Sequence, residues 1–270
     1  GSLTTSGASS YGIYANASSG TSTLTNSGTI TTSGASGHGV YSTSSSGTST
    51  LTNSGTITTG GASSHGVYNA GTITTSATNG YGIFNGDTIT TNGSSSYGIY
   101  NTGTITTSGE GGHGIYNSGT ITTNGDTSKG VCNSGTITTS GTGGHGIHSI
   151  GTITTNGNTS EGICNSGTIT TDGTSAYGIY SISSSGTSTI TNSGTITTSG
   201  NSGYGILSKD NSGTETITNS GTITTSGASG HGIFSENNNG TTTTTNSGTI
   251  TTSGLSGLSL IHISEPTRPY

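Results

Sequence analysis

Polar residues dominate the chain, and isolated β-branched apolar residues interrupt them at fixed intervals. The phrase Gly-Thr-Ile-Thr-Thr recurs with a 16-residue period between Gly55 and Gly167 and with a 27-residue period outside that block. In every copy up to Ile223, a second Ile or Val, preceded by a glycine, stands ten positions after the isoleucine. Such phasing in an otherwise polar chain predicts that apolar residues stack in two columns along a repeat structure.

The two columns define the expected core. The first comprises Ile30, Ile57, Ile73, Ile89, Ile105, Ile121, Ile137, Ile153, Ile169, Ile196, Ile223 and Ile250. The second comprises Val40, Val67, Ile83, Ile99, Ile115, Val131, Ile147, Ile163, Ile179, Ile206 and Ile233.

Each short unit is expected to form two brief strands, Thr-Ile-Thr and Gly-Ile-Tyr-Asn, joined by turns. No 3.6-residue period is present, and glycine is too frequent for helices. The predicted fold class is therefore all-β, a parallel β-helix (β-solenoid) of 16- and 27-residue repeats. It spans residues 1–257, with long units in 1–54 and 168–257 and short units in 55–167.

The repeat leaves the geometry of one coil open. A coil could contain one 16-residue unit or two, and the 11-residue inserts of the long units could form a third side or loop outward. Each insert carries another candidate for the core, namely Leu24, Leu51, Ile190 or Ile217. The Asn before most Ser-Gly turns is expected to form an amide ladder at a bend, since Asn tolerates left-handed backbone angles. This ladder would include Asn53, Asn69, Asn101, Asn117 and Asn133.

Two cysteines replace Tyr in the aromatic column that follows the second apolar residue. Cys132 and Cys164 stand at the same position of two short units, with one further short unit between them. If a coil is one unit they lie about 9.5 Å apart, too far to bond. If a coil is two units they are neighbours and could pair, but we expect two free small side chains in a semi-buried column.

Charge and composition exclude several classes of function. Charged residues make up 4% of the chain, and the only cations are Lys129, Lys209 and Arg268. Nucleic-acid binding and a polybasic membrane patch are therefore not expected, and no apolar run is long enough for a transmembrane helix. Met is absent, so we expect the natural N-terminus to lie upstream of Gly1.

The candidate chemical groups favour no catalytic site. Acidic residues are few, and Glu110 and Asp126, which we expect to share a column, lie in Gly-rich turns. Glycan cleavage needs clustered carboxylates, so we expect no enzyme and no cofactor. His38, His65, His113, His145 and His231 recur at a position that also holds Tyr, Lys and Glu, which is typical of an exposed turn. Although His148 lies near His145, no accompanying carboxylate or Cys cluster has zinc spacing, so no metal site is expected.

Two binding functions remain open at this point. The column of Tyr residues could stack on sugars, or it could simply pack from coil to coil. If Ile30 points inward, Thr29 and Thr31 point outward, and successive outward pairs would form a hydroxyl lattice. This pattern resembles repeat antifreeze proteins and gives a candidate ice-binding face of Thr29, Thr31, Thr56, Thr58, Thr72, Thr74, Thr104, Thr106, Thr120 and Thr122.

The repeat Asn-Ser-Gly-Thr-Ile-Thr-Thr-Ser-Gly followed by Gly-Ile-Tyr resembles repeats in the passenger domains of bacterial autotransporter proteins. The resemblance covers residues 1–257 and implies a right-handed β-helix on the bacterial cell surface, in contact with the membrane only through a C-terminal barrel that would follow. It implies a structural or adhesive rod with a host-cell or surface ligand, and it transfers no functional residues. The alternatives are an ice-binding protein or a secreted glycan-binding solenoid.

The last residues differ in composition. Residues 258–270 contain the only Arg and both prolines, Pro266 and Pro269, and are expected to depart from the repeat's spacing. They resemble a translated sequencing adapter, so we expect this tail to be non-native.

Overall fold

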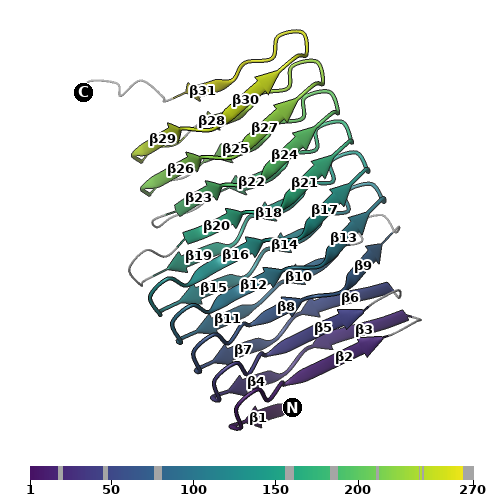
Figure 1. Cartoon of the computed structure of the whole chain (residues 1–270), viewed down its shortest axis with the longest axis vertical. Coiled ribbons are helices and arrows are strands. Elements are labelled where there is room, and N and C mark those ends of the chain that lie inside the picture. The colour runs from purple at the N-terminus through teal and green to yellow at the C-terminus, as the bar shows by residue number, and fades with distance from the viewer. Residues whose placement is uncertain are drawn as a thin grey trace.

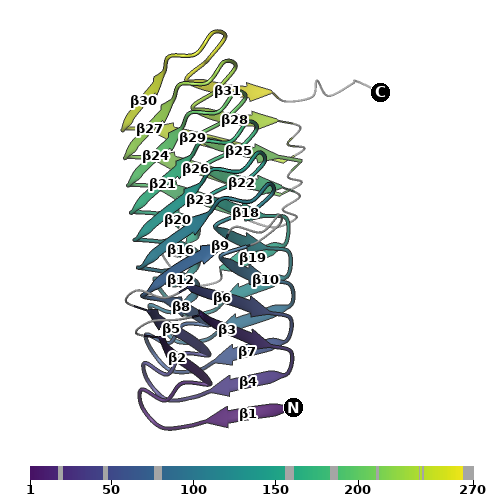
Figure 2. The same cartoon turned by 90° about the vertical axis from the view of Figure 1, so that its right-hand side faces the viewer.

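The chain forms a stack of parallel coils with no helix in the part that the structure describes. That part of the computed structural model comprises residues 1–17, 21–44, 48–75, 81–155, 161–182, 188–210, 213–236, 238 and 240–263. Figure 1 and Figure 2 show the coils rising from the N-terminus to the C-terminus. All strand pairs are parallel, so the predicted all-β solenoid is confirmed. Within the described ranges, no helix could cross a membrane.

Four sheets, here named A to D, run along the stack. Sheet A contains β1 (Ser2–Thr5), β4 (Thr29–Thr32), β7 (Thr56–Thr59), β11 (Thr88–Thr91), β15 (Thr120–Thr123) and β19 (Thr152–Thr155). Sheet B contains β2 (Ile13–Ala17), β5 (Val40–Ser44), β8 (Val67–Asn69), β12 (Tyr97–Asn101), β16 (Lys129–Asn133), β20 (Glu161–Asn165), β23 (Ser188–Asn192), β26 (Glu215–Asn219) and β29 (Thr242–Asn246).

The other two sheets complete the coil. Sheet C contains β3 (Thr21–Asn26), β6 (Thr48–Asn53), β10 (Ile83–Asn85), β14 (Ile115–Asn117), β18 (Ile147–Ser149), β22 (Ile179–Ile182), β25 (Ile206–Lys209), β28 (Ile233–Glu236) and β31 (Leu260–Ile263). Sheet D contains β9 (Thr72–Thr75), β13 (Thr104–Thr107), β17 (Thr136–Thr139), β21 (Thr168–Thr171), β24 (Thr195–Thr198), β27 (Thr222–Thr225) and β30 (Thr249–Thr252).

A central coil consists of two short units. Ile57 pairs with Ile89 and Ile89 with Ile121, and each pairing passes over one intervening short unit. Each coil therefore runs through sheets A, B, D and C in turn. The long units make 27-residue coils with three sides, as the pairing of Ile30 with Ile57 shows. Their inserts form one of those sides: β3 and β6 lie in sheet C, whereas β23 and β26 lie in sheet B.

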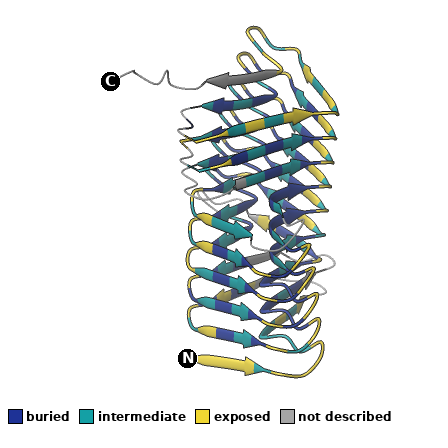
Figure 3. Cartoon of the chain, turned by 90° about the vertical axis from the view of Figure 1, so that its left-hand side faces the viewer, coloured by how far each residue is buried: buried dark blue, intermediate teal, exposed yellow. Residues whose placement is uncertain are grey.

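The apolar residues form four columns rather than the two we expected, because alternate short units lie on opposite sides of a two-unit coil. The columns meet in one continuous core, and Figure 3 shows buried positions recurring in every coil. Ile57, Ile89 and Ile121 are fully buried, whereas Ile153 and Ile250 are half-buried. The insert residues Leu24, Leu51, Ile190 and Ile217 join this core.

Two amide ladders run along the solenoid. In sheet B, Asn69 Nδ2 donates to Asn101 Oδ1 at 2.8 Å, and Asn101 Nδ2 donates to Asn133 Oδ1 at 2.8 Å. A second ladder in sheet C includes Asn53 and Asn117. The ladder prediction is thus confirmed, but the left-handed backbone lies elsewhere. In the described residues it falls on the Ser, Thr or Gly of the next turn, such as Ser95 (φ 55°) and Thr127 (φ 54°), and on Asp210 (φ 57°) after β25.

The last Thr of most Thr-Ile-Thr-Thr phrases closes the turn that follows through its hydroxyl, whereas the buried hydroxyls of Thr91 and Thr123 make no such bond. Thr32 Oγ1 donates to the carbonyl of Gly37 at 2.7 Å, and Thr107 Oγ1 donates to that of Gly112 at 2.6 Å. The glycine before the second apolar residue permits close approach of coils, because a Cβ at Gly114 would lie 2.4 Å from Ile137 Cγ2 and 2.7 Å from the Gly146 carbonyl oxygen. The Thr position is therefore constrained by its hydrogen bond, and the glycine position by the close approach of neighbouring coils.

Part of the C-terminal tail continues the ladder. β31 pairs with β28, with Leu260 in register with Ile233 of the preceding coil. The expectation that the tail departs from the repeat's spacing is therefore wrong for Leu260–Ile263, because an apolar residue falls at the column position. The non-native origin of residues 258–270 stays a prediction.

Candidate functional surfaces

Two threonine faces cover the sides of the solenoid formed by sheets A and D. In β15, Thr120 is exposed and Thr122 half-buried, whereas Ile121 and Thr123 are buried. The candidate ice-binding residues divide between these sheets. Thr29, Thr31, Thr56, Thr58, Thr120 and Thr122 lie in sheet A, and Thr72, Thr74, Thr104 and Thr106 lie in sheet D. Each face repeats at the strand spacing of about 4.8 Å.

The histidines expected in exposed turns are mostly buried. His38, His65, His113 and His145 are each 7–8% exposed, so that expectation is wrong for them. The five recurrent histidines also form two stacks instead of one column, because His38 and His65 precede strands of sheet B, whereas His113, His145 and the half-buried His231 precede strands of sheet C. His38 stacks on His65 with centroids 4.7 Å apart, and His113 stacks on His145 at 4.9 Å.

Each of these imidazoles accepts a backbone hydrogen bond from the next coil. His38 Nδ1 accepts from the His65 N–H at 3.0 Å, and His65 Nδ1 accepts from the Tyr97 N–H at 3.1 Å. The Nδ1 atom must be unprotonated for this bond, so the neutral ring carries its proton on Nε2. Desolvation by burial lowers the pKa of His38 from 6.5 to about 4. The pKa of His65 falls to about 3, by desolvation and then by the nearby His38. Sequence reasoning missed this role, for which the recurrence of His was the signal.

His148 replaces Tyr in the neighbouring column and creates a three-histidine cluster with His113 and His145. One nitrogen of each ring lies within 4.8 Å of the others, and this is the one such group of three among the described residues. Burial lowers the pKa of His113 to about 4, and burial with nearby histidines lowers those of His145 and His148 to about 2 and about 3. All three rings are therefore neutral near pH 7.

The hydrogen bonds of the cluster nevertheless do not suit a metal ion. His113 Nδ1 accepts from the His145 N–H and His145 Nδ1 accepts from the Tyr177 N–H, both at 3.0 Å. Both rings thus carry protons on Nε2, and His113 Nε2 donates to His148 Nδ1 at 3.0 Å. Metal binding through Nε2 would require breaking these bonds, since a ligating nitrogen needs a free lone pair.

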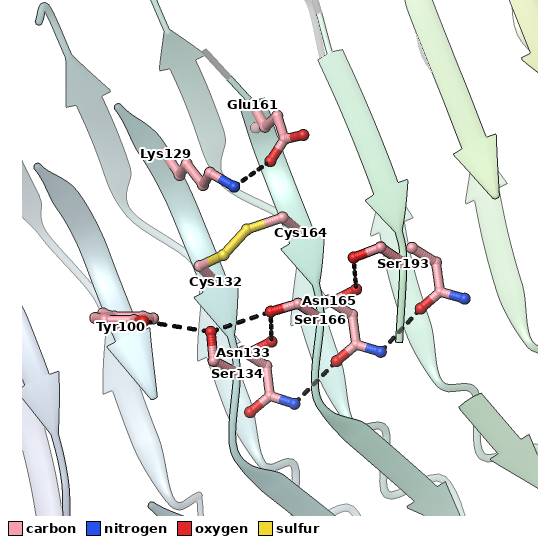
Figure 4. Close-up of a disulfide and its surroundings, with 12 residues drawn as sticks. Tyr100, Lys129, Cys132, Asn133, Ser134, Glu161, Cys164, Asn165, Ser166 and Ser193 are labelled. Atoms are coloured by element: carbon pink, nitrogen blue, oxygen red, sulfur yellow. Dashed lines mark hydrogen bonds and ion pairs between the residues drawn. A yellow bond between two sulfur atoms is a disulfide. The ribbon is translucent and has the colours of Figure 1, made fainter. Parts of the chain in front are cut away.

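Cys132 and Cys164 are register neighbours on β16 and β20 and form a disulfide, so the expectation of two free side chains is wrong. Their Cα atoms are 4.7 Å apart, because a coil contains two short units. Figure 4 shows Lys129 and Glu161 above the disulfide, where Lys129 Nζ lies 2.7 Å from Glu161 Oε2. Below it, Asn133 and Asn165 belong to the sheet B amide ladder. The two coils are therefore joined by covalent, ionic and amide contacts.

The carboxylates are dispersed over the described residues. Glu110 and Asp126 do not share a column, because Glu110 follows β13 of sheet D and Asp126 follows β15 of sheet A. Glu215 is fully buried in β26, where Ser208 Oγ donates to Oε1 and Asn238 Nδ2 donates to Oε2 at 3.2 Å. Such bonds satisfy a carboxylate that would otherwise be costly to bury.

The aromatic columns stack on themselves. On the sheet C side, His145 stacks on Tyr177 at 4.6 Å and Tyr177 on Tyr204 at 5.0 Å, with interplanar angles of 7° and 8°. Neighbouring rings therefore cover both faces of the inner rings. A sugar that stacks on an aromatic needs such a face, so coil-to-coil packing accounts for the column of His145, Tyr177 and Tyr204. The Tyr column considered for sugar stacking is the neighbouring one, in which Tyr68 stacks on Tyr100 at 5.4 Å and Tyr14 is 53% exposed, and sugar binding there stays a prediction.

These features define a parallel β-solenoid repeat domain whose regular surfaces are hydroxyl-rich. A family profile, the BigA fourth domain, matches residues 3–215. The chain belongs to this family and is thus a bacterial surface repeat protein. No characterised protein and no solved structure matches the chain.

Proposed function

We propose that the chain is a rigid, non-catalytic rod of a bacterial autotransporter passenger, which presents or spaces an adhesive region at the cell surface. The observation that carries this proposal is the continuity of the core. The apolar residues form one continuous core, and two overlapping amide ladders, one from Asn26 to Asn117 and one from Asn69 to Asn246, together reach from the N-terminal to the C-terminal coils, so the solenoid can act as one extended body. Repeat solenoids of this kind serve as extended scaffolds and binding surfaces.

The disulfide agrees with export of the chain from the cytoplasm. The Cys132–Cys164 disulfide would persist in an oxidising compartment such as the periplasm or the cell surface. The net charge of −6 and the scarcity of cations speak against a nucleic-acid partner. A host-cell or surface ligand is the partner that this proposal implies.

The absence of catalysis is part of the same proposal. Within the described residues the acidic groups lie in separate turns or, like Glu215, are held by hydrogen bonds inside the core. Purified chain should therefore release no product from polysaccharides, whereas hydrolysis that survives purification and disappears on unfolding would contradict it.

Sequencing of the genomic locus tests whether the chain is part of an autotransporter. Reading the native frame through both ends should reveal an export signal upstream and a membrane-anchoring domain downstream. A frame that encodes a signal but closes after a few coils without an anchor would instead support a secreted binding protein.

Adhesion tests the functional part. Beads coated with the full chain should bind host cells or matrix proteins more strongly than beads coated with the Ile121→Asp variant, whose buried charge lacks a partner and should unfold the surrounding coils. Equal binding by both would show that the folded rod is not the adhesive element.

Ice binding is the second candidate, favoured by the regular threonine faces of sheets A and D. Outward Thr side chains lie about 6.6–6.8 Å apart along a strand and about 4.8 Å apart between strands, which gives a flat hydroxyl lattice. Thermal hysteresis of the full chain would support it. Thr120→Tyr with Thr122→Tyr on sheet A, and Thr104→Tyr with Thr106→Tyr on sheet D, would show which face is responsible, and no hysteresis in the parent would remove the candidate.

A further inference from the structure

The aromatic column on sheet B stops in the middle of the rod. Its rings occupy one register position in successive coils and are those of Tyr14, Tyr41, Tyr68 and Tyr100. In the following coils the same position holds Cys132, then Cys164 and then Thr191. Tyr100 is therefore the last ring of this column.

This last ring differs from the rings inside the column. Tyr68 has ring neighbours in both adjacent coils, Tyr41 at 5.0 Å and Tyr100 at 5.4 Å. In the described part of the chain, the ring contacts of Tyr100 come only from its own coil and the preceding one. Tyr100 is half-buried, and the position in register with it in the following coil holds the small Cys132 instead of a ring. The change from a ring to a small side chain leaves a step in the surface, here named the Tyr100 step.

The column on sheet C has no such interruption through the four-sided block. Its rings follow one another from coil to coil and are those of Phe84, Tyr116, His148 and Tyr180. The Tyr100 step is therefore a local feature of sheet B, created where cysteine replaces tyrosine.

Polar groups of both charges lie beside the Tyr100 step. Lys129 Nζ lies 2.7 Å from Glu161 Oε2, and these side chains are 30% and 28% exposed. Ser134 Oγ donates to the Tyr100 hydroxyl at 3.3 Å and lies 3.1 Å from Ser166 Oγ. Figure 4 shows the charged pair above the disulfide and the two serines below it. The step thus combines an aromatic ring with a carboxylate, an ammonium group and hydroxyls.

We infer that the Tyr100 step binds one pyranose ring of a neutral glycan, with a C–H face of the sugar against Tyr100 and its hydroxyls towards the polar groups. An aromatic face can take up the apolar side of a sugar. The carboxylate accepts hydrogen bonds and the ammonium group donates them, and a sugar hydroxyl can do both. Because Lys129 and Glu161 together have no net charge, they favour a neutral ligand over an ion. This inference rests on the proposed function, for which it names the chemical class of the surface ligand.

Two variants that differ at one residue test whether the open side of Tyr100 is required. Cys132→Tyr with Cys164→Ser places the repeat's usual ring beside Tyr100 and closes the step. Cys132→Ser with Cys164→Ser removes the same disulfide but leaves the step open. Each full chain is applied to an array of neutral oligosaccharides that end in glucose, galactose, mannose or N-acetylglucosamine. Titration calorimetry then measures the Kd for the glycan that the parent binds best.

The parent and the open variant should bind this glycan with Kd values within about threefold of each other, whereas the closed variant should bind at least about tenfold more weakly, because a ring covers the stacking face. Tyr100→Thr should lose binding to a similar extent, and Thr191 shows that Thr fits this register position. No binding by the parent, or equal Kd values for the open and closed variants, would overturn the inference.

The same proteins separate this inference from the proposed function. Adhesion of the parent to host cells without binding to any of the neutral glycans would overturn the sugar site and leave the adhesive rod standing. Glycan binding that the closed variant loses, without adhesion to cells, would support the sugar site and contradict the adhesive part of the proposed function.

Discussion

At the residue scale, the solenoid depends on polar side chains that are buried and bonded between coils. Asn101 accepts from Asn69 and donates to Asn133, and its Nδ2 also donates to the Gly103 carbonyl at 3.2 Å. Because the chain has few apolar residues, these amides contribute where a larger core would in a globular domain. An unpaired buried polar group costs about 1–3 kcal/mol, so each ladder position affects its neighbours as well.

The ladder yields a direct prediction. Asn101→Ala should destabilise the central coils by about 2–4 kcal/mol, because it leaves one N–H of the Asn69 amide and the Asn133 side-chain oxygen without partners. Asn101→Ser should cost less, since Ser149 holds this position in the other ladder and accepts from Asn117 Nδ2 at 3.3 Å. Hydrogen exchange of residues 85–135 measures both. Equal protection in the parent and the Ala variant would contradict a stabilising ladder.

The buried histidines predict a dependence of stability on pH. The pKa values of His38 and His65 are lowered from 6.5 to about 4 and about 3. Their neutral forms therefore contribute full stability above pH 6.5, and this is lost as the pH falls towards 4, because the unfolded chain takes up protons first. The loss is on the order of 1–2 kcal/mol per histidine at pH 5. The rings packed around them are those of Tyr11, Tyr41, Tyr68, Tyr97 and Tyr100.

The double variant His38→Tyr with His65→Tyr is the matched control, since Tyr97 shows that Tyr fits the same stack. It should lower the melting temperature at pH 7, because two Nδ1 acceptors are lost. Between pH 6.5 and 4.5 its melting temperature should fall less than that of the parent. Parallel curves for the two proteins would mean that these histidines do not titrate on unfolding.

At the element scale, the short unit behaves as half a coil. Seven short units separate the two sets of long units, and they begin at Gly55, Gly71, Asp87, Gly103, Gly119, Gly135 and Gly151. Because this number is odd, the second set enters the coil on the opposite side, which places β6 in sheet C and β26 in sheet B. Whether the number of intervening short units is odd or even therefore determines the sheet that the later inserts join.

Deletion of units tests this rule. Deleting residues 88–103 removes one unit and should move the C-terminal inserts to sheet C, whereas deleting 88–119 removes a whole coil and should leave them in sheet B. Spin labels at Thr52→Cys and Thr218→Cys lie on outward positions of β6 and β26. Their distance should shorten more on deletion of one unit than of two, because only the former brings both labels to the same side. A larger shortening for the two-unit deletion would contradict half-coil equivalence.

The sequence predicted the strands, the inward isoleucines and the amide ladder, because period-2 alternation and fixed spacing record them directly. The sequence left the number of units in a coil open. Ile57 pairs with Ile89 rather than with Ile73, and the repeat alone does not show which units stack on each other. The misplacement of Glu110 and Asp126 in one column followed from that ambiguity. The recurrence of His was a signal for the burial of His38 and His65, but the residue type at a turn does not show that rings stack across coils, so this burial was missed. The end of sheet A at β19 depends on where the long units resume.

At the scale of the whole molecule, the solenoid is quasi-one-dimensional, and each coil contacts only the coils above and below it. A change in one coil should therefore affect neighbouring coils and fade with distance. The disulfide between β16 and β20 lies in the four-sided block, between the three-sided coils at either end. It links positions separated by 32 in the sequence, which corresponds to one complete coil.

Removal of this bond should therefore weaken the middle of the rod. Cys132→Ser with Cys164→Ser should cost about 2–4 kcal/mol, mainly because the unfolded segment is no longer constrained. Hydrogen exchange should show lost protection in residues 120–155 and 161–180, but little change in residues 21–44 or 213–236. Lys129→Gln with Glu161→Gln on the same coils is the control, because an ion pair that is about 30% exposed contributes at most about 1 kcal/mol. If protection fell evenly along the whole chain on loss of the disulfide, the coils would unfold as one cooperative unit, and the nearest-neighbour account of the rod would be wrong.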